Sequence, residues 1–239
     1  MRLFLIRYTK MMFTYLRLDV VFNFFSGFFA NLFYLTKFSS WVNKNRRLAY
    51  NDFPSRWDYN KRFSLYEWVM EHEKLKHTAI NYLEFGVADG HSIKWFVQQN
   101  SHAGSRFHGF DTFTGLPEDF GVYKKGQFNT NNKVPEMDDP RVTFYPGLFQ
   151  QTLPGFLSKI NTTNLNVIMM DADLYSATLY VLCTLAPFLK KDDIIFFDEF
   201  AVPTHEFKAF YDFTQAYYPD LKLIAAASNY YFAAFKVNS

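Results

Sequence analysis

The stretch "VIMMDADLYSA" (residues 167–177) runs from a buried apolar segment straight into two carboxylates. Asp171 and Asp173 are two residues apart, so an extended chain points both side chains to the same side. Two like charges at the end of a buried strand repel each other, and one of them takes up a proton unless a cation lies nearby. The rest of the sequence has to supply either that cation or a proton-transfer role for the pair.

Strands and helices alternate on both sides of this stretch. Short apolar runs predict strands at residues 81–87, 106–111, 141–147, 165–171 and 193–200, followed by a closing hairpin at 221–237. Segments with helical periodicity separate them, at residues 62–75, 91–100, 149–160, 176–190 and 205–218. This alternation predicts a doubly wound α/β fold with a mostly parallel sheet and helices on both faces.

Length and composition set limits on the kind of protein. The 239 residues, 49% of them hydrophobic, predict one full-sized globular domain with a modest extension. A single cysteine, Cys183, excludes an intramolecular disulfide and a cysteine-based zinc site. Residues 115–140 form a polar connection too long to be a plain loop, so we expect it to line a site.

In sheets of this kind ligands bind beyond the carboxyl ends of the strands. The segment "EFGVADG" ends one predicted strand with Glu84, Gly86 and Gly90. Glu84 stands where the pyrophosphate-binding Gly-x-G-x-x-Gly pattern has its first glycine, so this pattern favours a cationic ligand group such as the amino group of a methionine moiety. The glycines permit a tight turn and close backbone approach to a ligand, although a plain strand-to-helix turn also accounts for them.

Asp111 ends the next predicted strand, 25 residues after Gly86. An acid in that position can accept both hydroxyls of a ribose. The alternative is a capping or solvent-facing loop acid. Together, Glu84 and Asp111 describe an adenosine-containing ligand without a pyrophosphate, and S-adenosylmethionine fits that description.

A set of carboxylates points to a metal ion. Asp171 and Asp198 end consecutive predicted strands, and Glu199 adds a third carboxylate. Oxygen ligands without cysteine or clustered histidine favour a hard divalent cation, Mg²⁺ first, with Mn²⁺ and Ca²⁺ as alternatives. Solvated acids at strand ends are the simpler explanation. Asp173 reaches the same cleft and is the best candidate for a base, ahead of His205.

The first 50 residues differ from the rest of the chain. They hold eight basic residues against one acid, which leaves 17 basic and 22 acidic residues in the remainder. Arg7, Lys10 and Arg17 follow one narrow stripe of a predicted apolar helix, and residues 20–36 continue as an uncharged aromatic run. That run is shorter than the ~20 apolar residues of a spanning helix. Peripheral membrane contact through residues 1–36 and packing against the domain or a second subunit both remain open, whereas the acidic remainder argues against nucleic acid.

Five segments together resemble a known family: "YLEFGVADGHS", "GFDTFTGLPEDF", "RVTFYPGLFQQTLP", "DADLYSATL" and "IIFFDEF". Their order is similar to that in class I methyltransferases related to macrocin O-methyltransferase, and the likeness covers roughly residues 62–238. The resemblance implies a Rossmann-like, mostly parallel seven-stranded sheet. It also implies S-adenosylmethionine and Mg²⁺ as cofactors and a homo-oligomer.

The resemblance carries over to individual residues. It implies that Asp171, Asp198 and Glu199 hold the metal and that Asp173 is the general base. Many relatives have Asp-Asp where this chain has Asp198-Glu199, and some place a histidine where this chain has Leu174. The implied cofactor-binding residues are Glu84, Gly86, Gly90, Ser92, Asp111, Thr112, Gly147 and Asp171.

We therefore expect a basic, aromatic helical extension over residues 1–61 and an S-adenosylmethionine-dependent methyltransferase domain over residues 62–239. The expected reaction is Mg²⁺-dependent methylation of a hydroxyl on a sugar, glycan or glycosylated metabolite, in the cytoplasm or at a membrane surface. Two alternatives are a non-catalytic, membrane-associated S-adenosylmethionine-binding protein and a nucleotide-sugar or dinucleotide enzyme on the same sheet.

Overall fold

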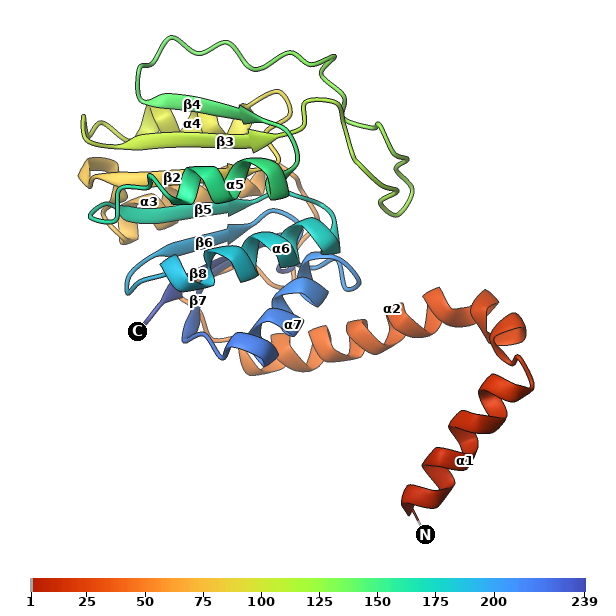
Figure 1. Ribbon diagram of the computed structural model, residues 1–239. Helices are drawn as coiled ribbons and strands as arrows, with labels where there is room; N and C mark the ends of the chain where they lie inside the picture. The colour runs from red at the N-terminus through yellow and green to blue at the C-terminus, as the bar shows by residue number, and fades with distance from the viewer. Residues whose placement is uncertain (1) are drawn as a thin grey trace.

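Strand β2 (Ile80–Phe85) lies inside an eight-stranded sheet that has helices on both faces (Figure 1). This computed structural model describes residues 2–239. All six residues of β2 are buried, as expected for an inner strand of a parallel sheet covered on both sides. The strand order is β1-β7-β8-β6-β5-β2-β3-β4, which confirms the doubly wound α/β prediction.

The sheet is parallel except at β8 (Phe232–Val237), which runs antiparallel to both of its neighbours. The other strands are β3 (Arg106–Asp111), β4 (Val142–Pro146), β5 (Leu165–Met170), β6 (Ile194–Phe197) and β7 (Leu221–Ala227). An eighth strand, β1 (Tyr50–Asn51), pairs with Ala225 and Ala226 of β7. The expectation of seven strands missed β1, because two residues carry no readable periodicity.

The helices form two layers around the sheet. One face is covered by α3 (Lys61–His72) and α4 (His91–Gln99), with the short 3₁₀ turn η1 (Leu75–His77) after α3. The opposite face is covered by α5 (Phe149–Leu157), α6 (Tyr175–Leu185) and α7 (Glu206–Tyr217), with η2 (Ala186–Phe188) after α6. Strand β2 serves both layers, since Leu83 and Phe85 pack towards α5–α7 whereas Tyr82 packs towards α3 and α4.

Two helices precede the sheet, α1 (Arg2–Tyr15) and α2 (Asp19–Lys44), and α2 extends well beyond the body of the molecule (Figure 1). The last part of α2 packs on α7 and the end of β6 through aromatic contacts. The ring centroids of Phe38 and Phe207 are 5.1 Å apart, and those of Trp41 and Phe200 are 5.0 Å apart. Part of the extension expected over residues 1–61 is thus built into the body.

Candidate active site

A cavity of about 730 Å³ opens at the carboxyl ends of the parallel strands. It has the size and position expected of a small-molecule site in a doubly wound sheet. The long β3–β4 connection contributes Leu116, Pro117 and Glu118 to its wall, as predicted for residues 115–140. The ends of β2, β3, β5 and β6 contribute Gly86, Asp111, Thr112, Asp171, Asp173, Asp198 and Glu199.

Gly86 follows β2 at a point where the neighbouring strand end comes very close. Its backbone has φ +95°, and a Cβ atom there would lie 1.7 Å from the carbonyl oxygen of Asp171. Hydrogen bonds fix this approach, because the Gly86 amide donates to Phe110 (2.9 Å) and the Asp171 amide donates to Phe85 (3.0 Å). The glycine is therefore required by the adjacent chain, whereas the sequence had suggested close approach to a ligand.

Four of the predicted cofactor-binding residues do not line this cavity. Gly90 precedes α4 with φ +76°, and a Cβ there would lie 3.0 Å from Pro135 of the long connection. Ser92 is buried within α4, and Gly147 borders a smaller hollow that it shares with Thr112. Glu84 is buried and is not among the lining residues. The cavity lining includes Gly86, Asp111, Thr112 and Asp171 from the predicted set.

Asp111 holds the turn that follows β2. Its Oδ2 accepts hydrogen bonds from the amides of Val87 and Ala88, each at 2.8 Å, and its Oδ1 accepts from the Phe113 amide at 2.8 Å. These amides belong to loops and not to the first turn of a helix, so Asp111 ties two loops together and does not act as a helix cap. Because Asp111 also lines the cavity, the contact with ribose hydroxyls stays a prediction.

Glu84 is fully buried on the α3–α4 side of β2, where it accepts a hydrogen bond from the hydroxyl of Tyr82. Burial raises the pKa of Glu84 to about 8, although the Tyr82 hydrogen bond acts in the opposite direction. A carboxyl group in this state carries a proton at neutral pH. An approaching cation would favour its charged form.

Four carboxylates meet at the ends of β5 and β6. Asp173 takes a left-handed backbone conformation, φ +58°, just after the strand. Burial first, and then repulsion from Glu199, raises the pKa of Asp173 to about 8. Burial and repulsion from Asp198 likewise raise the pKa of Asp171 well above its usual value. The repulsion inferred from the sequence is present, since Asp173 contributes to the raised pKa of Asp171. Burial and repulsion from Glu199 make Asp173 a stronger base than a free aspartate.

Asp198 has partners that sequence reasoning missed. Its Oδ1 accepts from the Tyr66 hydroxyl at 2.9 Å, and its Oδ2 accepts from the Tyr59 hydroxyl at 3.4 Å and from Arg62 at 3.5 Å. Arg62 is buried, and its guanidinium also lies 4.1 Å from the centre of the Tyr59 ring. Arg62 and Tyr66 are four residues apart on α3, and that spacing on one helix face was the available signal.

Glu199 is only partly satisfied by the protein. Its Oε1 accepts from the Tyr231 hydroxyl at 2.7 Å, while its buried Oε2 has no hydrogen-bond partner. Burial raises the pKa of Glu199 to about 7. Glu206, also buried, accepts from the Glu199 amide and leaves its Oε1 unpartnered. Unpartnered buried carboxylate oxygens call for a proton or a cation.

The donor chemistry at this edge suits a hard cation, because several carboxylate oxygens converge and one is unpartnered. Within residues 2–239, however, no three acidic, histidine or cysteine side chains lie in a ready metal-binding arrangement. Tyr66, Tyr59 and Arg62 already engage both oxygens of Asp198.

His205, the weaker candidate base, is not among the residues that line the cavity. Its ring packs edge-on against Phe120, with centroids 4.7 Å apart, and burial lowers its pKa. The aromatic rim of the cavity was not predicted. Trp57, Tyr59 and Tyr231 supply it from outside the motifs.

Comparison with known proteins decides the class of this site. Residues 83–200, which carry all the strand ends described above, match the family described as "Methyltransferase domain". The chain carries a methyltransferase domain. The prediction of a methyltransferase enzyme is thereby confirmed, while the narrower macrocin O-methyltransferase relationship stays a resemblance. No protein of curated function matches the methyltransferase chain in sequence.

Solved structures share the fold of this methyltransferase. CalS11, a calicheamicin methyltransferase, is 23% identical over 75% of this chain and 78% of its own, with a TM-score of 0.56. The O-methyltransferase NovP is 17% identical over 76% of this chain and 79% of its own, with a TM-score of 0.55. A cmcI structure with Mg and SAM is 15% identical over 84% of both chains, with a TM-score of 0.51. Identities this low show a common class I methyltransferase fold.

Proposed function

We propose that this methyltransferase moves the methyl group of S-adenosylmethionine to a hydroxyl of a sugar, glycan or glycosylated metabolite. The observation that carries the proposal is the placement of Asp173, a raised-pKa carboxylate, among the acids of the strand-end cavity. The neighbours give support, since NovP is an O-methyltransferase and CalS11 a TDP-rhamnose 3'-O-methyltransferase.

The reaction follows from the cavity. S-adenosylmethionine would lie across the ends of β2 and β3, where Gly86, Asp111 and Thr112 line the wall. The acceptor hydroxyl would lie against β5 and β6, beside Asp173. Asp173 takes the hydroxyl proton while the oxygen forms a bond to the methyl carbon. The carbon–sulfur bond breaks, its electron pair stays on sulfur, and S-adenosylhomocysteine leaves.

Two features of Asp173 suit it to this role. A general base works best when its pKa lies near the working pH, and burial together with repulsion from Glu199 raises the pKa of Asp173 to about 8. The aromatic residues that line the cavity, including Trp57 and Tyr231, would hold the acceptor oxygen and the methyl group together. Such positioning supplies a large share of the rate in two-substrate reactions.

Mg²⁺ is part of the proposal. Asp171, Asp198 and Glu199 would hold it, and the unpartnered Oε2 of Glu199 is the observation in its favour. A bound Mg²⁺ would lower the pKa of an acceptor hydroxyl and neutralise the carboxylate cluster. Arg62 already performs part of that neutralisation for Asp198.

Methyl transfer to a panel of nucleotide sugars and soluble glycans tests the proposal. S-adenosylhomocysteine release would be measured together with the mass gain of the acceptor. We expect activity with at least one hydroxyl acceptor and a loss of roughly 100-fold or more in Asp173→Asn, within the range of general-base effects. Methylation only of nitrogen acceptors, or full activity in Asp173→Asn, would contradict it.

A further inference from the structure

The N-terminal arm, defined here as α1 and residues 19–33 of α2, exposes an unusual amount of apolar surface. We propose that this arm binds the surface of a membrane that contains anionic lipids. The inference goes beyond methyl transfer and does not rest on it, because the arm lies outside the cavity.

The arm is almost free of contacts with the body. No residue of α1 is buried, and Val42, which lies outside the arm, is the only fully buried residue of α2. Large aromatic side chains stand in solvent, with Phe24 86% exposed, Phe4 73% exposed and Phe28 65% exposed. Exposed apolar patches of this extent mark interaction sites.

The direction of the apolar surface is set by the way α2 packs. Tyr34, Phe38 and Trp41 contact the body and define its inner side. At about 100° per residue, the large apolar residues among residues 19–33 of α2 cover an arc of roughly 220°, which contains one polar residue, Asn31, near its edge and is centred away from this inner side. Asn23 and Ser26 lie on the narrow remainder, towards the inner side. The apolar face therefore points away from the protein's own body.

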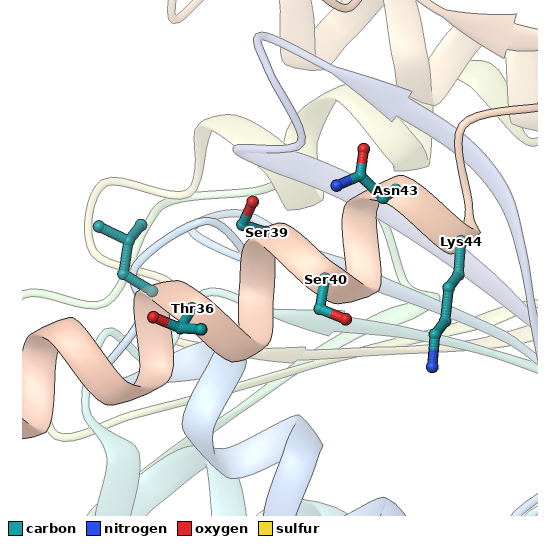
Figure 2. Close-up of a pocket in the computed structure, with 6 residues that line it drawn as sticks. Thr36, Ser39, Ser40, Asn43 and Lys44 are labelled. Carbon is teal, nitrogen blue, oxygen red and sulfur yellow. The ribbon is translucent and has the colours of Figure 1, made fainter.

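The same outer face changes character where α2 reaches the body. Phe25, Phe29 and Leu32 occupy it in the free half, and all three are exposed. Beyond Leu35 a row of hydrophilic side chains takes over along this side of the helix (Figure 2): Thr36, Ser39, Ser40, Asn43 and Lys44. A single boundary between apolar and polar surface, placed across one helix, is what a protein at a lipid–water interface requires.

The charges of the arm favour an anionic surface. Arg2, Arg7 and Lys10 lie on α1, which contains no acidic residue. The one acid of the arm, Asp19, is paired with Arg17 at 3.1 Å. Basic residues beside a broad apolar face are typical of helices that lie in the interface of anionic membranes.

The arm lies at the membrane surface in this proposal. No single helix in residues 2–239 is long and apolar enough to cross a membrane, and α1 and α2 meet that criterion only as a pair bent by 112°. Figure 1 shows the free half of α2 extending past the body on the side towards which β3 and β4 run. The cavity opens at those strand ends, so a docked enzyme would hold it close to the bilayer.

Co-sedimentation of the full chain with phosphatidylcholine vesicles, with and without phosphatidylglycerol, tests the proposal. We expect tight binding only to the anionic vesicles, and weaker binding as salt rises. The double variant Arg7→Glu/Lys10→Glu should bind at least roughly 30-fold more weakly, as expected for the loss of two surface cations. The matched control Lys159→Glu/Lys222→Glu makes the same charge change on exposed residues of the body and should bind like the unaltered protein.

A second variant, Phe25→Ser/Phe29→Ser, tests the apolar part of the arm. It should also release the protein from anionic vesicles, while S-adenosylmethionine binding by the body stays unchanged. Light scattering without lipid then tests the alternative, in which the arm packs against a second copy of this chain and forms a dimer. A dimer that Phe25→Ser/Phe29→Ser dissociates, together with no vesicle binding by the unaltered protein, would overturn the proposal. Equal losses in the arm and control charge variants would overturn it as well.

Discussion

Replacing Glu84 by glutamine should change how stability depends on pH. Glu84 is fully buried, and its pKa is raised from 4.5 in the unfolded chain to about 8 in the fold, chiefly by burial. The folded state therefore binds the Glu84 proton more tightly than the unfolded state does. The resulting stability is fully present below about pH 4.5 and is lost as the pH rises through about 8. Glutamine keeps the shape of the protonated acid but cannot ionise.

The size of the effect follows from the two pKa values. A rise from 4.5 to about 8 corresponds to an upper bound on the order of 5 kcal/mol, lost between those two pH values. Urea unfolding followed by tryptophan fluorescence at pH 5, 7 and 8.5 measures it. We expect the free energy of unfolding of Glu84→Gln, relative to that of the unaltered protein, to rise by roughly a few kcal/mol from pH 5 to pH 8.5. Glu67→Gln, the same change at an exposed site on α3, should show no such gain. A difference between Glu84→Gln and the unaltered protein that does not vary with pH would refute the reasoning.

Three further predictions concern the strand ends. Gly86→Ala should destabilise the fold by more than about 3 kcal/mol in thermal unfolding, because its Cβ would meet the Asp171 carbonyl. The control Gly27→Ala, which has open space around it, should not lower the stability measurably. Arg62→Met should cost on the order of 3 kcal/mol in urea unfolding, since it leaves the buried Asp198 without its cation, and an unchanged midpoint would refute that pairing. Methyl transfer should stop in EDTA and return with Mg²⁺. Asp198→Asn should weaken Mg²⁺ binding in calorimetry and leave the affinity for S-adenosylmethionine nearly intact. Full activity in EDTA would show that the carboxylates hold no catalytic metal.

Much of the fold could be read from sequence because the inner strands are short, mainly apolar runs that alternate with segments of helical periodicity. The predicted bounds of β3 match the observed ones, and the predicted β5 is one residue too long at its carboxyl end. The two-residue strand β1 could not be found this way, since it is defined by its partner β7 and not by its own pattern. The packing of Phe38 and Trp41 against α7 could not be predicted either, because it depends on a partner distant in the sequence.

The carboxylates of the candidate site could be predicted because they directly follow strands. Asp171, Asp173, Asp198 and Glu199 were expected at one edge, and they line one cavity. The partners of Asp198 were not expected, because Tyr59, Arg62 and Tyr66 come from a segment more than 100 residues earlier in the chain. The structure adds a second reason for Gly86, since a sequence does not show that the Asp171 carbonyl occupies the space beside it, and its approach to a ligand stays a prediction.

Isothermal titration calorimetry with S-adenosylmethionine, set against NAD⁺ under the same conditions, tests the central claim most directly. Both ligands contain adenosine, but NAD⁺ carries a pyrophosphate that the "EFGVADG" turn is not built to hold. We expect saturable binding of S-adenosylmethionine at one site per chain and no binding of NAD⁺. Binding of NAD⁺ without binding of S-adenosylmethionine would contradict it.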